Sequence, residues 1–347
     1  MVERIQPALD EACRALSENR ERPWIIAFSG GKDSTAALKI MVAAARKLGQ
    51  DAPTFDLIYC DTGVENPIVD SYVKSTLERL SQECSESEIS LNVSLLRAPV
   101  QQRFFVKVIG RGYPTPTNSF RWCTKELRIK PVASFIREKL VDDAIVVIGS
   151  RLDESEQRKR SMGGANASRW QKQREGKGEY DIYLPILDFT VSDVWDSIFA
   201  INKPESIDCR ELEEIYWGAS EECPIIRSPN ESPCASGRFG CWTCTVVRRD
   251  HSAEQLIKSG RTELKPFLEL RNWLAEFRNR HDMRWSQRRN GARFPGPFSL
   301  RGRRLILDRV RELESTINVP IIGPDELTEI TRLWELDKEH ECEISNS

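Results

Sequence analysis

The strongest constraint on the fold is a short glycine-containing segment at residues 29–34, with the sequence SGGKDS. It directly follows the apolar run at residues 24–28, which has the length and composition of a buried strand. Residues from about 34 to 48 are expected to form a helix. The segment therefore joins a strand to a helix, a setting in which backbone N–H groups and the positive helix end bind anionic oxygens. This arrangement predicts a phosphate-binding loop.

The side chains of this loop have distinct expected roles. Ser29 and Ser34 can donate hydroxyl hydrogen bonds and Lys32 can supply positive charge, so all three are catalytic candidates. Asp33 is a further catalytic candidate, as a Mg²⁺ ligand or as a residue that positions the fold, since Mg²⁺ prefers carboxylate and phosphate oxygens. The spacing is not that of a Walker A loop. Because glycines also let the backbone approach a ligand closely, the predicted nucleotide-binding residues are Ser29, Gly30, Gly31, Lys32, Asp33 and Ser34.

Short apolar runs alternate with helical patterns over the first part of the chain. Strands are expected at residues 55–60, 89–97 and 144–148, and helices at residues 66–81 and 130–139. Alternation of this kind predicts an α/β fold with a doubly wound, mostly parallel sheet.

Polar and glycine residues follow two further predicted strands at the point where each strand ends. An open α/β sheet binds its ligand at the carboxyl ends of its strands. The arginines after the fourth strand could neutralise charge that develops on a phosphate, or each could form a surface salt bridge. The additional predicted nucleotide-binding residues are Asp61, Thr62 and Gly63 after the second strand, and Gly149, Arg151 and Arg158 after the fourth. Arg151 is also a catalytic candidate.

The chain is expected to contain two regions. Residues 1–228 would form the α/β domain, with a mobile loop at about 155–180, and residues 229–347 a cysteine-rich segment followed by a mainly helical region. The net charge of −2 conceals a basic block at residues 245–311, with 17 Lys+Arg and 7 Asp+Glu. Residues 312–347 are acidic, with 2 Lys+Arg and 10 Asp+Glu. The basic block indicates an anionic partner such as nucleic acid, or a solvated helical surface partly neutralised by the acidic tail.

The chain shows no sign of membrane insertion or export. No stretch approaches the roughly 20 apolar residues that a membrane span needs, and residues 1–20 contain no apolar core of a signal peptide. We therefore expect a cytoplasmic protein without membrane contact. Its ten cysteines are then not expected to form disulfides, because cytosolic thiols remain reduced.

Four of the cysteines form a candidate metal site. Cys241 and Cys244 make a Cys-x-x-Cys motif, Cys234 lies shortly before it, and Cys123 lies in the middle of the chain. Four thiolates can complete a tetrahedral site for a metal or an iron–sulfur cluster. Unligated thiols are the alternative.

The hexapeptide at residues 29–34 resembles the PP-loop of the ATP pyrophosphatases, whose fold is of the adenine nucleotide alpha-hydrolase type. Together with the segments at the strand ends it is similar to the phosphoadenosine phosphosulfate reductase branch of that superfamily. The resemblance implies ATP as substrate, Mg²⁺, and contact with the nucleotide around Gly63, Gly149 and Arg151. In related reductases, cysteine motifs hold a [4Fe–4S] cluster. This implies a cluster here on Cys123, Cys234, Cys241 and Cys244, with Zn²⁺ as second choice.

Residues 236–247, with the sequence SGRFGCWTCTVV, resemble the DNA phosphorothioation sulfurtransferases of the DndC and SspD type. The segments at residues 121–124 and 183–186 are also similar to that family, and the resemblance runs from about residue 24 to residue 256. It implies an ATP pyrophosphatase and DNA sulfurtransferase in bacterial defence, which replaces a non-bridging phosphate oxygen of DNA by sulfur. The implied partners are DNA of unspecified strandedness, a cysteine desulfurase as sulfur donor and other phosphorothioation proteins.

Three other functions are compatible with these motifs. A phosphoadenosine phosphosulfate reductase needs a resolving cysteine in a C-terminal motif, whereas Cys342 is isolated in an acidic tail. A tRNA thiolase would share the phosphate loop. A non-catalytic, ATP-sensing DNA-binding subunit of a modification complex would bind ATP but release no pyrophosphate.

Overall fold

The computed structural model describes residues 4–86, 89–139, 143–154, 167–175, 178–219, 239–289, 291–292 and 295–345. Its internal contacts divide the chain into two compact units, each assembled from separate segments. The first unit comprises Met1–Cys60, Ile68–Leu96 and Val132–Phe239, and the second comprises Asp61–Pro67, Arg97–Pro131 and Gly240–Ser347.

This division is more interleaved than the linear one expected from the sequence. The predicted boundary between residues 228 and 229 falls within residues 220–238, outside the described part of the chain. The second unit also takes in residues 61–67 and 97–131, which the sequence analysis assigned to the first domain. Hydrophobic patterning predicts elements but not which core each element joins, so these two segments could not be assigned from the sequence.

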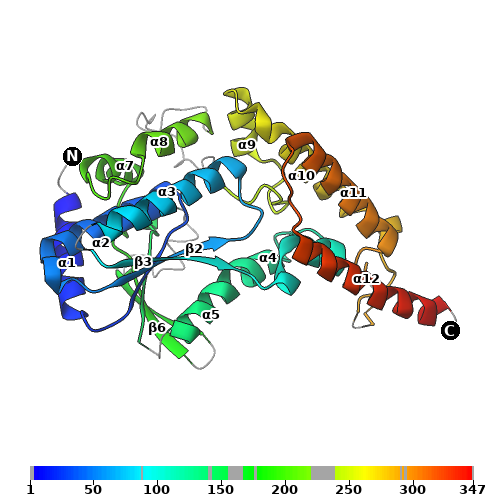
Figure 1. Ribbon diagram of the computed structural model, residues 1–347, viewed down its shortest axis with the longest axis horizontal. Coiled ribbons are helices and arrows are strands. Elements are labelled where there is room, and N and C mark those ends of the chain that lie inside the picture. The colour runs from blue at the N-terminus through cyan, green and yellow to red at the C-terminus, as the bar shows by residue number, and fades with distance from the viewer. Residues whose placement is uncertain are drawn as a thin grey trace. The chain divides into compact units, whose positions relative to one another are not determined.

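The first unit contains a six-stranded sheet with the order β3-β2-β1-β4-β6-β5. Figure 1 labels β2, β3 and β6 of this sheet. Strand β1 is parallel to β2 and to β4, β4 is parallel to β6, and β5 is antiparallel to β6. The predicted mostly parallel α/β fold is thus confirmed. The strands are β1 (Trp24–Ala27), β2 (Phe55–Asp61), β3 (Leu91–Arg97), β4 (Ile145–Ile148), β5 (Trp170–Glu175) and β6 (Gly178–Tyr183).

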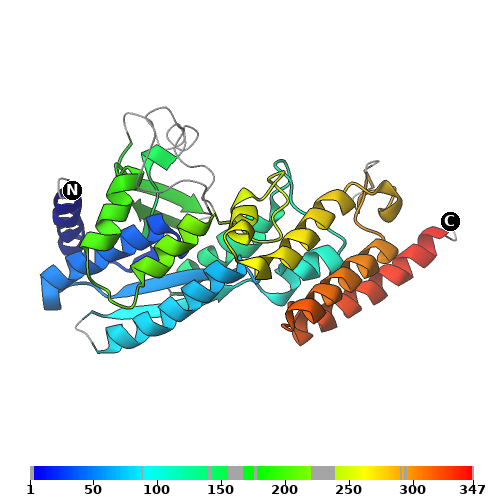
Figure 2. The same cartoon turned by 90° about the horizontal axis from the view of Figure 1, so that it is seen from above.

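Helices cover both faces of this sheet because neighbouring side chains along each strand point to opposite faces. Trp24 and Ile26 of β1 pack into one core, whereas Ile25 packs into another with Val146 of β4. Figures 1 and 2 show the helices on the two sides. The first face carries α1 (Ile5–Glu18), α2 (Lys32–Leu48), α3 (Pro67–Ser85), α7 (Val191–Ala200) and α8 (Cys209–Gly218), and the second carries α5 (Lys130–Lys139).

Strands β5 and β6 correct the expected loop at residues 155–180. Residues 155–166 and 176–177 lie outside the described part, but residues 170–175 and 178–183 form an antiparallel pair at the edge of the sheet. The prediction of a loop is therefore wrong for residues 170–175 and 178–180. An edge strand has one side without a neighbouring strand and tolerates charged side chains, so residues 170–175 lack the apolar pattern of a buried strand.

The second unit is helical, which confirms the prediction for the C-terminal region. Its core brings together apolar side chains such as Phe105, Leu274, Phe298 and Ile330. Its helices are α4 (Trp122–Thr124), α9 (His251–Lys258), α10 (Lys265–Phe277), α11 (Leu300–Ile317) and α12 (Pro324–Ser345), with π-helical segments at Val106–Gly110 and Lys125–Ile129. Short 3₁₀ turns occur at Gly49–Asp51, Val100–Gln102, Leu152–Glu154, Thr262–Leu264 and His281–Met283.

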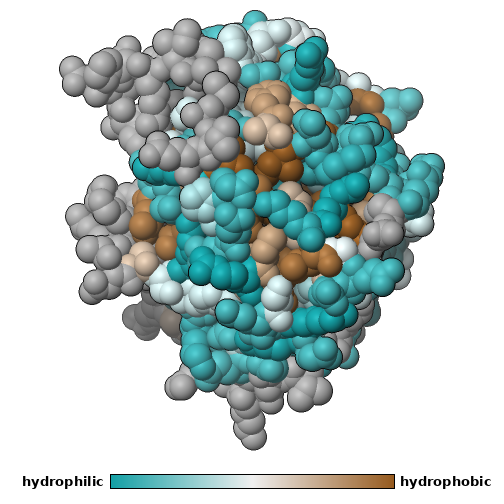
Figure 3. Space-filling view, turned by 90° about the vertical axis from the view of Figure 1, so that its left-hand side faces the viewer, coloured by the Kyte–Doolittle hydropathy of each residue, from teal (hydrophilic) through white to brown (hydrophobic). Residues whose placement is uncertain are grey.

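The helices were also compared with the length and apolarity that a membrane-spanning helix needs. Within the ranges that the structure describes, each helix is too short or too polar to cross a lipid bilayer. The face of the molecule in Figure 3 carries mainly hydrophilic side chains with smaller hydrophobic patches between them. Scattered apolar side chains of this kind are normal on globular proteins.

Candidate nucleotide-binding site

The phosphate loop is held in shape by hydrogen bonds between its own residues. Ser34 Oγ accepts a hydrogen bond from the backbone N–H of Ser29 at 3.2 Å and donates one to the carbonyl of Gly31 at 2.9 Å. The two hydroxyl oxygens of Ser29 and Ser34 lie 3.0 Å apart. Gly30 has a φ of +72°, and a Cβ there would lie 2.0 Å from a methyl carbon of Val73. The loop therefore requires glycine at this position and presents the N-terminus of α2 beyond it.

Gly149 allows strand β4 to pack directly against this loop. A Cβ on Gly149 would lie 2.4 Å from the carbonyl oxygen of Asp33 and 2.7 Å from the backbone nitrogen of Ser34. Strands β1 and β4 are neighbours, and from them the chain continues toward opposite edges of the sheet. This is a topological switch point, the place where an open α/β sheet binds its ligand. The structure thus brings together the predicted residues after β1 and after β4.

Asp33 joins two cations at the start of α2. Its Oδ2 lies 3.0 Å from Lys32 Nζ, and its Oδ1 pairs with Arg151 Nε. Arg151 is only 2% exposed and also donates to the carbonyl of Phe189 at 3.2 Å. Burial raises the pKa of Asp33, but Lys32 and Arg151 outweigh it and lower that pKa below its usual value.

This geometry bears on the alternatives left open for Asp33 and Arg151. Both carboxylate oxygens of Asp33 are engaged by cations, which favours a positioning role over a Mg²⁺ ligand. The burial of Arg151 excludes a surface salt bridge. Arg151 holds the carboxylate that in turn orients Lys32 at the phosphate loop.

Tyr216 of α8 is a site residue that the sequence analysis missed. Its hydroxyl accepts a hydrogen bond from the backbone N–H of Lys32 at 3.1 Å, and its ring centroid lies 5.2 Å from Lys32 Nζ. The hydroxyl thus occupies one of the amide donors that a phosphate would use. No local signal could reveal this contact, because the two residues lie far apart in the chain and α8 has no motif of its own.

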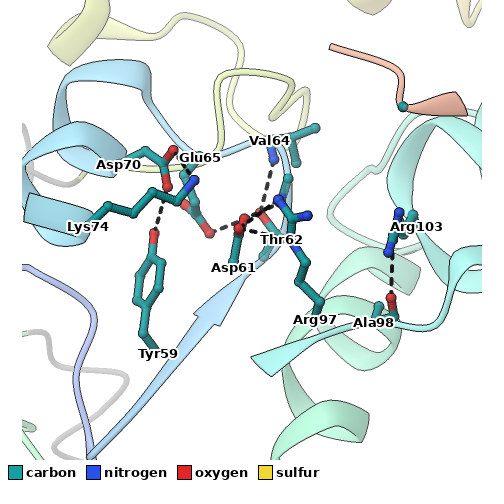
Figure 4. A network of polar contacts seen from close by, with 12 residues as sticks. Tyr59, Asp61, Thr62, Val64, Glu65, Asp70, Lys74, Arg97, Ala98 and Arg103 are labelled. Carbon is teal, nitrogen blue, oxygen red and sulfur yellow. Dashed lines mark hydrogen bonds and ion pairs between the residues drawn. The ribbon is translucent and has the colours of Figure 1, made fainter. Parts of the chain in front are cut away.

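The predicted residues after β2 belong to the second unit and form a compact turn (Figure 4). Asp61 is 3% exposed and accepts hydrogen bonds from the backbone N–H of Gly63 and from Arg97 Nε, both at 2.9 Å. Thr62 Oγ1 donates to Glu65 Oε1 at 2.9 Å. In the first unit, Figure 4 also shows Asp70 accepting from the hydroxyl of Tyr59 at 3.3 Å. The Asp61 carboxylate therefore stabilises the turn, where Gly63 has a φ of +74°.

Glu65 connects this turn to the Cys-x-x-Cys segment and was also missed from the sequence. It forms an isolated β-bridge with Cys241, and the backbone N–H of Trp242 donates to the carbonyl of Val64 at 2.9 Å. Arg128 NH2 lies 3.0 Å from Glu65 Oε1 and 3.8 Å from Cys241 Sγ. The two segments therefore fold together around one carboxylate and one guanidinium.

The described cysteines do not by themselves form a metal site. Burial raises the pKa of Cys123, and burial with Glu65 raises the pKa of Cys241 to about 12. The backbone N–H of Cys244 donates to the carbonyl of Cys241 at 2.9 Å. Yet no three His, Cys, Asp or Glu side chains in the described part converge closely enough to hold a metal ion. We therefore derive no catalytic step through a metal cluster.

Two predicted site residues lie outside the described part of the chain. They are Arg158, expected at the nucleotide, and Cys234, expected as the fourth cysteine ligand. Both assignments remain predictions.

The family of the chain follows from a comparison with protein-family models. Residues 23–246 match the model described as "Phosphoadenosine phosphosulfate reductase domain". The match covers more than half of the chain and includes both the phosphate loop and the Cys-x-x-Cys motif. The chain belongs to this family. The narrower resemblance to DNA phosphorothioation sulfurtransferases stays a prediction.

A curated relative matches only part of this chain. An uncharacterized protein of Methanocaldococcus jannaschii is 32% identical over 138 residues, which are 40% of this chain and 25% of that protein. The chain thus spans about a quarter of this relative's length.

Solved structures with a similar arrangement are all remote in sequence. FMN adenylyltransferase from Candida glabrata is 15% identical, with a TM-score of 0.36 and 63% of each chain covered. Phosphoadenylyl-sulfate reductase from Candida auris is 13% identical, with a TM-score of 0.33 and 55% and 84% covered. The NH3-dependent NAD synthetase of Campylobacter jejuni is 12% identical, with a TM-score of 0.35 and 80% and 96% covered. At these TM-scores the similarities carry no argument about activity.

Proposed function

We propose that this protein is an ATP pyrophosphatase that cleaves ATP between its α- and β-phosphates to activate a phosphate group of DNA for sulfur transfer. The observation that carries the first half of this proposal is the phosphate loop at the switch point of the sheet. Its backbone N–H groups, the Ser29 and Ser34 hydroxyls and the Lys32 ammonium lie together at the N-terminus of α2. Such a cluster of donors suits the phosphates that leave as pyrophosphate.

In this mechanism the chain's own residues bind and orient the nucleotide. The N-terminus of α2 and Lys32 would neutralise charge on the β- and γ-phosphates, and Asp33 would hold Lys32 in place. Tyr216 would release the Lys32 amide when a phosphate arrives. Mg²⁺, when bound with the nucleotide, would neutralise further phosphate charge.

The proposed transfer of sulfur to DNA proceeds in three steps. A non-bridging oxygen of a DNA phosphate attacks the α-phosphorus of ATP, and pyrophosphate leaves. The terminal sulfur of a persulfide, supplied by a cysteine desulfurase partner, then attacks the activated DNA phosphorus and displaces AMP. A thiol cleaves the resulting sulfur–sulfur bond, which leaves the phosphorothioate on DNA and a disulfide between the two thiol groups.

The basic block of the second unit supports DNA as the acceptor, but only part of it is available for binding. Arg303 is fully buried and donates to the carbonyl of Gly110 at 2.9 Å and to Asp337 at 2.6 Å. Arg289 pairs with the same carboxylate, and Arg284 donates to the carbonyl of Gly296 at 2.7 Å. These arginines support the fold, so neutralising them would not report on DNA binding alone.

Arg301 and Arg304 are better candidates for DNA contacts. Both are exposed, and their spacing of three residues places them on one side of α11. Arg309 on the same helix is paired with Glu312 at 2.7 Å, which makes it a matched control. Arginine–phosphate contacts of this kind position a DNA backbone without reading its sequence.

One experiment tests both halves of the proposal: pyrophosphate release from ATP, measured with and without DNA. The wild type should release pyrophosphate and be stimulated by DNA. Ser34→Ala should lose release in both conditions, since Ser34 organises the loop. Arg301→Gln with Arg304→Gln should keep DNA-independent release but lose stimulation. Its DNA affinity should fall less steeply with salt, by a slope of about 0.9 per lost phosphate contact.

The control for that experiment is Arg309→Gln with Glu312→Gln, which removes an arginine without changing net charge. Its DNA stimulation should match the wild type. Binding of ATP without any release of pyrophosphate would overturn the enzymatic proposal in favour of an ATP-sensing subunit. Release that responds to tRNA and not to DNA would identify a thiolase of RNA.

The family match itself supports a second candidate, a reductase of phosphoadenosine phosphosulfate. Such an enzyme would release sulfite from that compound in the presence of a thiol donor. Sulfite formation by the wild type, with no pyrophosphate release from ATP, would select this function over DNA modification.

We further propose that Cys123, Cys234, Cys241 and Cys244 hold a [4Fe–4S] cluster, with Zn²⁺ as the second choice. Cys123 and Cys241 pack against the same hydrophobic core, and the backbone N–H of Cys244 donates to the carbonyl of Cys241 at 2.9 Å, which supports it. Anaerobically purified protein should contain iron and acid-labile sulfide in equal amounts, and Cys244→Ser should lose most of both. Cys84→Ser is the control, because Cys84 is buried in the core of the first unit and should leave the iron content unchanged. Stoichiometric zinc without sulfide would refute the cluster.

A further inference from the structure

A polar cavity lies at the start of α8, next to α2, α3 and the end of α7 and away from the phosphate loop. Its volume is about 490 Å³, and its lining includes Lys39, Arg79, Cys209 and Arg210. The backbone of Lys32 contacts Tyr216, and Lys39 contacts Cys209, so the two helices run antiparallel along this stretch. Seven residues of helix separate the two contacts, a distance of about 10 Å. The cavity is therefore distinct from the nucleotide site and belongs wholly to the first unit.

Lys39 is the unusual residue of this cavity. It is 1% exposed, and within the described ranges the one hydrogen-bond partner of its Nζ is Cys209 Sγ at 3.2 Å. A buried ammonium has three N–H donors and is costly to desolvate unless an anion or several acceptors satisfy it. A thiol sulfur is a weak acceptor, so an anion bound next to Lys39 Nζ would stabilise the buried ammonium.

Cys209 lies beside a buried cation at the start of a helix. It begins α8, so the partial positive charge of the helix N-terminus adds to the charge of Lys39. Its sulfur also lies 3.4 Å from the carbonyl of Ile198 and 3.5 Å from the carbonyl of Ile207, to which the protonated thiol can donate. The cysteine is half-buried and lines the cavity, so a small reagent can reach it.

The remaining charges of the cavity favour an anionic ligand. Arg79 and Arg210 line it together with Lys39, and Arg79 Nε also donates to the carbonyl of Ser206 at 3.1 Å. Its two carboxylates are already engaged: Asp208 caps α8 by accepting from the backbone N–H of Glu211 at 2.9 Å, and Glu205 pairs with Lys203.

We propose that this cavity is a second reactive site, in which the Cys209 thiolate attacks small anionic molecules that contain a sulfur–sulfur bond. The Cys209 sulfur forms a bond to one sulfur of the ligand while the ligand's own sulfur–sulfur bond breaks. The other sulfur leaves as a thiolate and takes up the proton that Cys209 lost, so no external oxidant or reductant is needed. Disulfides and persulfides with carboxylate groups share this chemistry.

The test compares two disulfides of similar size and different charge on the full chain. Dithiodipropionate is anionic and bis(hydroxyethyl) disulfide is neutral. Peptide mass spectrometry would follow the rate at which each cysteine forms a mixed disulfide. Burial raises the pKa of Cys84 to about 11, so Cys84 serves as a slow internal reference. We expect Cys209 to react at least ~10-fold faster than Cys84 and to prefer the anionic reagent.

Lys39→Met should abolish the charge preference at Cys209, because it removes the ammonium and keeps an unbranched side chain. Should circular dichroism show that this variant is unfolded, Arg210→Gln replaces it, since Arg210 is exposed and lines the same cavity. It should reduce the preference for the anionic reagent without affecting the reaction of Cys84. A Cys209 that reacts no faster than Cys84, or a charge preference unchanged in a folded variant, would overturn the proposal.

Discussion

Replacing Asp33 by asparagine is expected to destabilise the first unit by about 3 kcal/mol, the lower end of the cost of removing one partner of a buried ion pair. Arg151 is 2% exposed and pairs with Asp33 Oδ1, so the variant removes the nearest carboxylate of a guanidinium that cannot reach solvent and leaves it with Asp153 at 3.6 Å. Lys32 Nζ loses a carboxylate at 3.0 Å as well. Urea-induced unfolding of wild type and variant would measure the difference in free energy.

A matched control separates burial from the loss of a carboxylate. Asp51 pairs with Arg20 at 2.7 Å, but both side chains are largely exposed. Asp51→Asn should therefore cost less than about 1 kcal/mol. Equal destabilisation by both substitutions would show that the ion pair of Asp33 and Arg151 contributes no more to stability than an exposed ion pair.

The effect of Asp33 should also depend on pH. The pKa of Asp33 is lowered in the folded state, chiefly by Lys32 and Arg151 against the opposing effect of burial. A carboxylate with a lowered folded pKa stabilises the protein above its unfolded pKa of about 3.9 and loses that effect as pH falls through the folded value. The difference in stability between wild type and Asp33→Asn should therefore be full at neutral pH and shrink in acid. A difference that grew in acid would contradict this assignment.

The sequence predicted the parts of the site that lie within one local motif. Glycines, serines and a lysine between an apolar strand and a helix suffice to predict the loop at residues 29–34, because the strand–turn–helix setting is local. The strand ending at Ile148 was predicted for the same reason, and it places Gly149 against Asp33.

Contacts between distant segments could not be predicted in this way. Tyr216 lies in an ordinary amphipathic helix, and only the packing of α8 along α2 brings its hydroxyl to Lys32. Glu65 meets Cys241 through a single β-bridge, which has no sequence signature. Arg303 looks like one more charge in a basic block, yet it is buried against Asp337. From composition alone this arginine would be placed on the surface. In the structure its ion pair with Asp337 links α11 to α12.

Replacing Gly149 by alanine is expected to disturb the contact between β4 and the phosphate loop. In Gly149→Ala the new methyl group would lie 2.4 Å from the carbonyl oxygen of Asp33 and 2.7 Å from the backbone nitrogen of Ser34. These are backbone atoms, so no side-chain rotation relieves the overlap, and the start of α2 must move away from β4. We expect a destabilisation on the order of 1–3 kcal/mol, as for other overpacked positions.

The same displacement should lower the rate of pyrophosphate release by roughly 10²-fold, the usual effect of an error of about 1 Å in a binding group. Gly240→Ala is the control, since a Cβ on Gly240 would have no heavy atom within 4 Å and its φ lies outside the left-handed region. Thermal unfolding and pyrophosphate release measured on the two variants would give the answer together. If Gly149→Ala unfolded and turned over like wild type, the close approach of β4 to α2 would not be what shapes the phosphate loop. If it kept its stability but lost turnover, the strain would be confined to the loop, and the catalytic geometry would be more sensitive than the fold.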